Sequence, residues 1–455
     1  MKICKLLNTV RGVAALPLLF VVLLPSGMQA QQRWTLQECI DYALQNNITL
    51  KKSVLARQSA VEELKQSQAA LLPSLSASTN QSLGYRPWTN SGISTVTNGT
   101  VSSSVSKSYY NGSYGLNASW TVWNGNRNRN QVKLNRLAEE QAELDSAYTA
   151  NNIQEQIAQL YVQILYMNEA IAVNEQSLEA SKKNEERGQE MVNVGKMSKA
   201  DLAQLTAQRA TDEYNLVSAR SNLANYKLQL KQLLEITDQN FDIDVPAASD
   251  EQALTEIPSL PAVYEAALAY RPEIENSRLS IQSSDVQLSI AKAQGLPTVS
   301  MTGGLGTSTN SLGNNGWGDQ IKTNFDASIG ATVSIPILDN RSTRTAVNKA
   351  KLQQEQAQLD LIEKQKQLYA TIEGFWLDAN TNQQKFRAAL LSVESEQMSY
   401  DLLSEQFSLG LKNIVELMNG KTNLLNAQQN MLQSKYVTIL SQQLLLFYTG
   451  AKLNI

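Results

Sequence analysis

LAEEQAELD at residues 137–145 returns as LQQEQAQLD at residues 352–360, an offset of 215 (352 − 137 = 215). The same offset relates two glycines that are each followed by an acidic residue and a leucine. These are Gly195 with Asp201-Leu202 and Gly410 with Glu416-Leu417. Nearer the N-terminus, LPSLS at 72–76 matches LPTVS at 296–300, an offset of 224 (296 − 72 = 224). Self-similarity at a nearly constant separation indicates an internal duplication.

The duplication predicts the domain organisation. The first repeat is placed at 31–236, a linker at 237–261 and the second repeat at 262–455. The first repeat has nine extra residues (224 − 215 = 9), which we assign to a longer hairpin loop. Residues 1–30 are predicted to be a signal peptide, because a basic segment precedes a short apolar run that ends before Ala30. That run is shorter than the roughly 20 residues of a membrane-spanning helix.

The composition excludes several classes of protein. The 455 residues carry 39 Lys and Arg against 42 Asp and Glu, which gives no basic footprint for nucleic acid. Histidine is absent, so His-based catalysis and the usual zinc sites lose their central residue. Cys4 would leave with the signal peptide, and Cys39 then has no partner for a disulfide. Residues 36–38 before Cys39 lack the small residues of a lipid-attachment site, so we expect a small buried side chain on a helix.

Four stretches alternate apolar and polar residues with a period of two, which predicts strands that have one polar face. The apolar positions are Leu75 and Ala77, then Leu116, Ala118, Trp120 and Val122, then Val299, Met301, Gly303 and Leu305, and finally Phe325, Ala327, Ile329, Ala331, Val333 and Ile335. The segments from about 86 to 111 and from about 307 to 322 are rich in Ser, Thr, Asn and Gly. That composition predicts solvated loops inside the two hairpins.

Each repeat is predicted to contain a first helix and then an unusually long one. Residues 35–71 form the first helix of the first repeat, and Pro73 ends it. Residues 130–189 and 344–404 contain no proline, and Gly374 does not interrupt the helical pattern. A 60-residue helix is roughly 90 Å long. The apolar seam of these helices is narrow, which predicts side-by-side packing like that of a coiled coil.

Four alternating strands in an exported protein predict part of a transmembrane β-barrel. Four strands cannot close a barrel, and an open sheet in a bilayer would leave edge N–H and C=O groups without partners. The chain is therefore expected to oligomerise. Two copies give eight strands, whose interior is filled by side chains, whereas three give twelve and leave a channel. Trp120, Trp123, Tyr85 and Tyr114 lie near strand ends, either as an interfacial belt or as ordinary packing aromatics.

The chain resembles the TolC family of outer-membrane efflux proteins. The resemblance rests on WTLQECIDYALQNN at 34–47, the paired Leu-Pro strand starts, the two glycine turns and the duplication itself. It implies an α+β membrane protein: a homotrimer with a 12-stranded barrel in the outer membrane of a Gram-negative bacterium, continued by a long α-helical coiled-coil barrel across the periplasm. It also implies a periplasmic adaptor and an inner-membrane transporter of the RND, ABC or MFS class as partners, in efflux or type I secretion. Transport through this subunit would be passive, with no cofactor and no enzymatic activity.

The resemblance also implies a gate at the periplasmic end of the helical barrel. The turns at Gly195 and Gly410 would move in an iris-like change when the adaptor docks. Glu416 and Asn419 would line the constriction, and Asp201 and Lys412 would hold neighbouring coiled coils closed through polar links. Two positions depart from the family pattern. Asn419 stands where the family usually has an acid, which would weaken a cation-selective ring. Phe407 stands where the family can have a tyrosine, so that hydroxyl link would be missing.

Simpler interpretations of these residues stand beside the gate. Asp201 and Glu416 each follow a potential N-cap residue by three positions, Ser198 and Asn413, a spacing that stabilises any helix start. The two roles are compatible. Residues 420–422 (GKT) resemble the end of a phosphate-binding loop, but Val415 occupies the position that needs glycine.

Two other classes of protein are less consistent with the sequence. A structural coiled-coil protein of the cell surface or periplasm would explain the long helices and the export signal. It has no need for four alternating strands at matching points of a duplication. A periplasmic adaptor is expected to have one helical hairpin between compact β-domains, not two hairpins in tandem.

Overall fold

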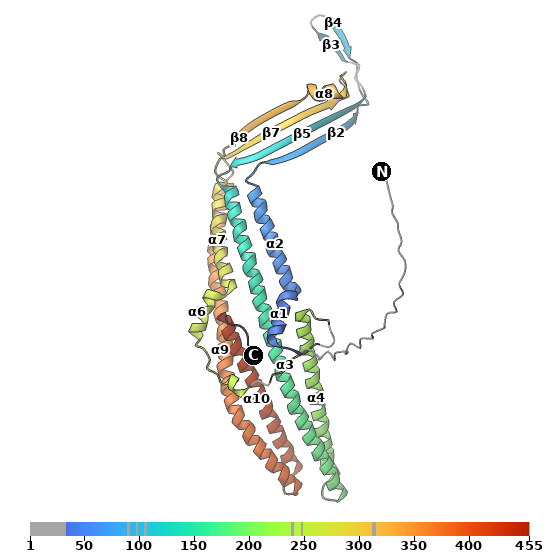
Figure 1. Ribbon diagram of the computed structural model, residues 1–455, viewed down its shortest axis with the longest axis vertical. Helices are drawn as coiled ribbons and strands as arrows, with labels where there is room; N and C mark the ends of the chain where they lie inside the picture. Colours follow the sequence, from blue (N-terminus) through green and yellow to red (C-terminus); the bar gives the residue numbers. More distant parts are fainter. Residues whose placement is uncertain are drawn as a thin grey trace, which may run out of the picture.

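The computed structural model describes residues 33–88, 92–96, 99–103, 107–237, 241–246, 249–311 and 315–454. The predicted signal peptide lies outside these residues. The molecule is elongated, with a β-sheet at one end and paired helices extending away from it (Figure 1). In each repeat a long helix runs from the sheet to the opposite end, and a shorter helix returns part of the way (Figure 1).

The first repeat contains α1 (Leu36–Asn46), α2 (Ile48–Ala69), α3 (Arg127–Asn193) and α4 (Lys199–Leu234). The expectation of a single helix over 35–71 is wrong, because the chain breaks at Asn47. The Asn47 carboxamide oxygen accepts hydrogen bonds from the backbone N–H groups of Thr49 and Leu50, at 2.8 and 3.1 Å, and thereby caps α2. Its amide nitrogen donates to the Leu233 carbonyl at 2.9 Å, which fixes the break against the end of α4.

The second repeat contains α6 (Leu260–Tyr270), α7 (Pro272–Ala293), α9 (Ser342–Ser408) and α10 (Ile414–Tyr448), preceded by the short α5 (Asp250–Ala253). The predicted long helices are confirmed and are longer than expected, since α3 and α9 each have 67 residues. At 1.5 Å per residue each is about 100 Å long. Gly374 lies inside α9 without interrupting it. Within the described part of the chain, no helix combines the length and the apolar character needed to cross a membrane.

The predicted strands form one antiparallel sheet of four strands in the order β2-β5-β7-β8. The strands are β2 (Ser74–Tyr85), β5 (Ser108–Trp123), β7 (Thr298–Asn310) and β8 (Asp326–Ser334). The first hairpin supplies β2 and β5, and the second supplies β7 and β8. The two repeats meet in the middle of the sheet, and β2 and β8 are its edges.

The strand register places most of the predicted apolar positions on one face. A bulge in β5 pairs Trp123, not the predicted Val122, with Val299, and Phe325 and Ile335 lie just outside β8. One row across the sheet is Leu75, Ala118, Gly303 and Ile329, and the next is Ala77, Leu116, Leu305 and Ala327. This face is uncovered in the single chain, with Leu75 74% exposed and Ile329 81% exposed. The opposite face has polar and small residues such as Asn117 and Thr302. The alternation in the sequence therefore corresponds to one apolar and one polar face of the sheet.

The hairpin segments contain more structure than the expected loops. Within the segment predicted as a loop from 86 to 111, β3 (Gly92–Val96) pairs with β4 (Gly99–Ser103), and β5 already begins at Ser108. Within the segment from 307 to 322, β7 continues to Asn310 and a short helix α8 (Trp317–Thr323) follows. The buried Gln320 holds α8 on the sheet, because its side chain exchanges hydrogen bonds with the backbone of Asn310, at 2.7 and 2.9 Å. Polar composition alone does not reveal such pairing.

The main hydrophobic core lies near the middle of the helices, far from the sheet. Helices α1, α3, α7, α9 and α10 meet there, and fully buried side chains of this core include Tyr161, Ile164, Ile274, Ile372 and Leu444. A two-stranded parallel sheet of β1 (Arg33–Trp34) and β6 (Asp242–Ile243) joins this core. Cys39 is completely buried in it, as predicted, and burial raises the pKa of its thiol to about 12.

Candidate functional site at the helical tips

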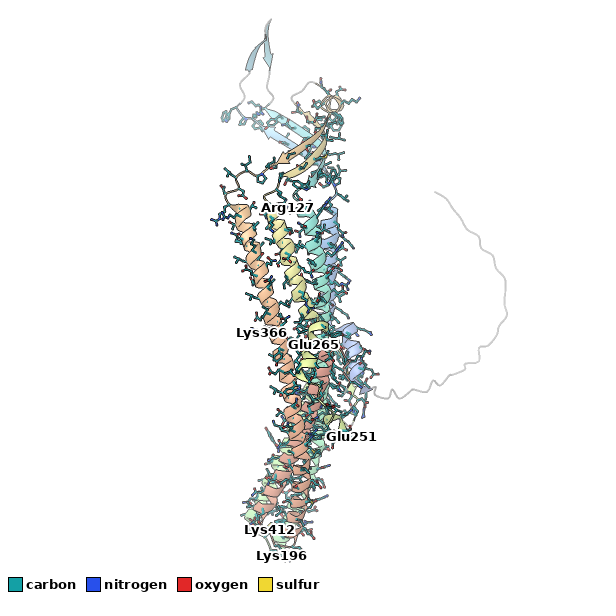
Figure 2. All side chains as sticks on the ribbon, turned by 90° about the vertical axis from the view of Figure 1, so that its left-hand side faces the viewer. Arg127, Lys196, Glu251, Glu265, Lys366 and Lys412 are labelled. Atoms are coloured by element: carbon teal, nitrogen blue, oxygen red, sulfur yellow. The ribbon has the colours of Figure 1, made fainter. Side chains whose placement is uncertain are left out.

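The two long helical hairpins turn back at the end of the molecule opposite the sheet. Lys196, beside the turn between α3 and α4, and Lys412, beside the turn between α9 and α10, lie at this end, far from Arg127 at the start of α3 (Figure 2). The predicted gate residues are therefore all brought to one end. They lie on two turns that are 215 residues apart in the chain (410 − 195 = 215).

The two turns have the same backbone geometry. Gly195 has φ of +75° and Gly410 has φ of +77°, a left-handed conformation that favours glycine. In the first turn Lys196 N donates to Met191 O at 2.8 Å, and in the second Leu411 N donates to Gln406 O at 2.9 Å. These bonds close the last turn of each outgoing helix. Added Cβ atoms would meet nothing within 4 Å at either glycine, so backbone conformation alone requires glycine there.

Each returning helix begins with the predicted side-chain cap. In α4, Ser198 Oγ accepts from Asp201 N at 3.1 Å and donates to an Asp201 carboxylate oxygen at 2.8 Å. In α10, Asn413 Oδ1 accepts from Glu416 N at 3.0 Å, and Asn413 N donates to a Glu416 carboxylate oxygen at 3.3 Å. The capping interpretation is therefore confirmed for both pairs.

The second turn carries an ion pair in addition to its cap. Lys412 Nζ lies 2.6 Å from Glu416 Oε1, and both side chains are more than a third exposed. Hydrogen bonds from Lys412 and from the Asn413 backbone N–H lower the pKa of Glu416. Glu416 therefore carries its negative charge at neutral pH, in a partly exposed position at the end of the molecule. Asn419, one helical turn further along α10, is also exposed.

The two tips are joined by a small apolar cluster. Its buried members come from both hairpins and are Leu205, Phe407, Ile414 and Leu417, with Met197, Tyr400 and Met418 packed around them. Phe407 is 3% exposed, so its ring is packed inside this cluster. The absence of a hydroxyl at position 407 is thus matched by an apolar environment. Within one chain, the two hairpin tips form a single packed unit.

The sequence reasoning missed a buried polar cluster above the tips. Ser181 of α3, Asp212 of α4 and Lys421 of α10 contact one another and are at most 5% exposed. Lys421 belongs to the GKT sequence at 420–422, which only superficially resembles a phosphate-binding loop. A signal was present, because Leu417, Lys421 and Leu424 have the i, i+4, i+7 spacing of one buried helical face. A lysine on such a face indicates a buried partner.

In the described residues, no three or more His, Cys, Asp or Glu side chains are grouped to hold an ion. Two carboxylates of α3 lie in surface ion pairs instead. Arg57 lies 3.0 Å from Glu143 and 4.0 Å from Glu139, in partly exposed pairs.

The arrangement of one sheet, two long hairpins and paired glycine tips matches known proteins over nearly the whole chain. The family model described as outer membrane efflux protein matches residues 39–235 and 263–451. The chain belongs to this family. It is thus an outer-membrane exit duct, and the family is one of transport proteins.

Relatives and solved structures agree with this membership. The outer membrane protein TolC of Escherichia coli K12 is 24% identical over 439 residues, covering 94% of this chain and 84% of TolC. The outer membrane efflux protein BepC of Brucella suis is 24% identical over 426 residues, covering 93% of this chain and 86% of BepC. The crystal structure of CusC superimposes with a TM-score of 0.78 at 17% identity, covering 92% of each chain. The last comparison shows that the fold is shared.

Proposed function

We propose that three copies of this chain form a 12-stranded barrel in the outer membrane of a Gram-negative bacterium, continued by a helical duct across the periplasm. The observation that carries this proposal is the four-stranded sheet, which has one uncovered apolar face and two free edges. An apolar face suits contact with lipid, and a polar face suits a water-filled lumen. The open edges require partners before such a sheet can lie in a bilayer.

The geometry of the edges favours a closed ring of copies. The edge strands β2 and β8 have 12 and 9 residues, close to the length that spans a bilayer. Edge strands of this length are avoided in proteins unless they are paired or protected. Three chains provide 12 strands and leave an open interior, whereas eight strands from two chains would be filled by side chains. A homotrimer thus provides hydrogen-bond partners for the backbone N–H and C=O groups of β2 and β8 and leaves a pore through the barrel.

The aromatic side chains near the ends of the sheet support a membrane location. Trp120 and Trp123, 38% and 39% exposed, lie on β5 near the helices, and Tyr85, 66% exposed, lies at the other end of the sheet on β2. Such positions suit interfacial belts at the two membrane surfaces. Tyr114 instead packs its ring against Trp317, with the centroids 6.3 Å apart. We assign the belt role to Trp120, Trp123 and Tyr85.

The helical part has the size and the surface for a periplasmic duct. Helices of about 100 Å extend the channel well beyond a bilayer of about 40–45 Å. Large apolar side chains remain exposed along α9 in the single chain, among them Leu352, Leu359, Ile362, Leu377 and Leu391. Neighbouring copies in a trimer would cover a surface of this kind. The duct is passive, and a periplasmic adaptor and an inner-membrane transporter of the RND, ABC or MFS class supply the substrate and the energy.

The tips are the proposed periplasmic gate. Glu416 and Asn419, at least partly exposed on the first turns of α10, would line the constriction. Asp201 and Lys412 would link neighbouring copies when the channel is closed, and their intrachain contacts to Ser198 and Glu416 are exposed and open to exchange. The apolar tip cluster packs the turns at Gly195 and Gly410 against each other, and opening would have to rearrange it.

Membrane fractionation followed by native mass determination of the detergent-extracted protein tests the proposal. We expect a homotrimer in the outer-membrane fraction. The matched variants Ile329→Lys and Ser328→Lys place the same charge on opposite faces of β8. A lipid-facing lysine near the membrane midplane costs about 2–4 kcal/mol, whereas a lumen-facing one is tolerated. We expect Ile329→Lys to lower the amount of assembled trimer far more than Ser328→Lys. A soluble monomer, or equal effects of the two variants, would contradict the barrel.

A further inference from the structure

A buried charged cluster links the two repeats above the helical tips. Lys421 of α10 donates through Nζ to Asp212 Oδ2 of α4 and to Ser181 Oγ of α3, and Ser181 donates to the same Asp212 oxygen. Gln208, one turn before Asp212, donates to its other carboxylate oxygen at 3.1 Å. Ser181, Asp212 and Lys421 are 3%, 2% and 5% exposed. We call these three residues the buried triad.

The cost of burying the charges of Lys421 and Asp212 is offset only while the members of the buried triad stay in contact. Burial lowers the pKa of Lys421, and Asp212 opposes that shift by stabilising the ammonium. Taking one member of a buried ion pair away leaves the other charge desolvated and unpaired, which is strongly unfavourable. Replacing both by apolar groups of similar size is often neutral. The triad thus adds little attraction beyond what apolar packing would provide, but it penalises any motion that separates the two charges.

The position of the buried triad relates it to the entrance. Lys421 follows Glu416 by five residues on α10, a rise of about 7–8 Å. Moving along α10 from the apolar tip cluster toward the middle of the molecule, the contact of Lys421 with Asp212 and Ser181 is the first buried polar contact with the α3–α4 hairpin. Farther from the tips, the next such polar contact joins Tyr436 OH of α10 to Glu169 of α3 at 2.7 Å. The segment of α10 that carries Glu416 and Asn419 is therefore held against the first repeat chiefly by the tip cluster and the triad.

We propose that Lys421 is a positioning residue for the gate: through Asp212 and Ser181 it holds the Glu416-bearing segment of α10 against the α3–α4 hairpin of the same chain and opposes opening. This inference rests on the proposed function. It adds an intrachain restraint to the links between copies assigned to Asp201 and Lys412. Opening that moves α9–α10 relative to α3–α4 has to separate the triad, and therefore exposes its charges to water at the same time.

Single-channel conductance of the purified trimer in a planar bilayer tests this role. Lys421→Met keeps the side-chain length and removes the charge, leaving Asp212 unpaired inside the bundle. We expect the open-to-closed ratio to rise about tenfold or more. The double variant Asp212→Leu with Lys421→Met replaces the ion pair by apolar packing, and we expect it to return toward the wild-type ratio. Ser181→Ala removes only a neutral partner and should give a smaller rise.

A second buried lysine on the same helix provides the matched control. Lys435 lies 14 residues beyond Lys421 (435 − 421 = 14), a rise of about 21 Å away from the tips. Its Nζ contacts Asp250 at 3.0 Å and Glu169 of α3 at the longer distance of 3.9 Å. Its side chain is 8% exposed. Lys435→Met therefore also removes a buried positive charge from α10, without releasing the segment near the tips. We expect it to lower the thermal unfolding midpoint while leaving the open-to-closed ratio at the wild-type value.

The outcomes separate a gating role from a role in stability alone. If Lys421→Met lowers the unfolding midpoint and leaves the open-to-closed ratio unchanged, the positioning role is wrong, although the trimeric channel stands. If Lys421→Met does not assemble, Ser181→Ala decides: a ratio equal to wild type overturns the proposal. A rise of the same size in Lys435→Met also overturns it. Absence of any trimer or conductance from the wild-type protein would instead refute the proposed function.

Discussion

The two helical hairpins share a backbone plan but differ in how deeply they are packed. Positions related by the offset of 215 illustrate this: Val217 of α4 is 60% exposed, whereas Leu432 of α10 is 4% exposed. In the same way Ser221 is exposed, whereas Tyr436 is 2% exposed. The difference teaches that the duplication preserved turns, caps and helix lengths while the packing of the two copies diverged. Helix α10 became a central element and α4 a peripheral one.

Truncation at the equivalent positions 217 and 432 provides the largest expected contrast. Leu432→Ala should lower the free energy of unfolding by about 2–5 kcal/mol, because it opens a cavity in a packed helix interface. Val217→Ala should change it by less than about 0.5 kcal/mol in the isolated chain, since the side chain is largely exposed. Chemical denaturation of the two variants measures both values. Equal losses would contradict the contrast between α4 and α10 seen in the single chain, and would place Val217 in an interface between copies.

The caps provide a smaller contrast between the hairpins. Ser198→Ala removes both hydrogen bonds of its cap, the one accepted from the Asp201 N–H and the one donated to the Asp201 carboxylate. Asn413→Ala removes only the side-chain half of a capping box, because the backbone N–H of residue 413 still donates to Glu416. Such losses range from about 0.5 to 2 kcal/mol, and we expect Ser198→Ala to fall in the upper part of that range. Thermal unfolding of the two variants side by side tests the order. The comparison fails if Asn413→Ala is the more damaging substitution.

The junctions where the sheet meets the long helices offer a stabilising test. Asn126 and Arg341, again 215 residues apart, both have positive φ, of 65° and 67°. Asparagine tolerates this conformation, whereas arginine is strained in it. Arg341→Gly should therefore raise the free energy of unfolding by about 0.5–1 kcal/mol, and Asn126→Gly by less. A loss of stability in Arg341→Gly would mean that its side chain has a role that outweighs the backbone strain.

The smallest expected effect is a pH dependence confined to the second tip. Met197 stands in the first tip where the second has Lys412, so the ion pair with Glu416 has no counterpart. Because the folded-state pKa of Glu416 is lowered, its stabilising contribution is present above the ordinary value of 4.5 and is lost as pH falls through the folded-state value. Lys412→Met should be slightly less stable than wild type at neutral pH, and the difference should shrink as the pH falls below the ordinary carboxyl value and Glu416 becomes protonated. A difference that persists at low pH would assign the effect to packing.

Much of the fold followed from local patterns, whereas the contacts between distant segments did not. Period-two alternation predicted which face of each strand is apolar, and the register of Leu75 with Ala118 and of Gly303 with Ile329 agrees with it. The glycine turns and their caps were equally local. The break between α1 and α2 at Asn47 was not predicted. Whether an asparagine within a helical pattern ends the helix depends here on its contact with the distant Leu233 carbonyl.

The site shows the same division between local and distant information. The cap at Asn413 and Glu416 was readable from a spacing of three residues. The contact of Lys421 with Asp212 and Ser181 joins residues more than 200 positions apart, and depends on how the two repeats pack. The spacing of Leu417, Lys421 and Leu424 on one helical face indicates that Lys421 is buried, but it does not indicate which residues Lys421 contacts. The link between copies through Asp201, the position of Asn419 in the constriction and the trimeric assembly stay predictions.

The central claim is that three sheets join edge to edge into one closed barrel, and disulfide cross-linking between edges tests it most directly. Within one chain, β2 and β8 are three strand spacings apart, about 14 Å, well beyond the reach of a disulfide of at most about 7 Å between Cα atoms. A cysteine at Ser76 on β2 is paired in turn with cysteines along β8 at Ser328, Gly330 and Thr332, which lie on the same polar face of the sheet. These pairs can therefore react only between copies. The native Cys39 is buried, and its raised thiol pKa keeps it unreactive.

Oxidation of the membrane-embedded protein should convert at least one of these pairs into covalent dimer and trimer with no larger species, because a ring of three has no free edge. Monomer throughout the series, or a ladder that continues beyond three copies, would contradict the account.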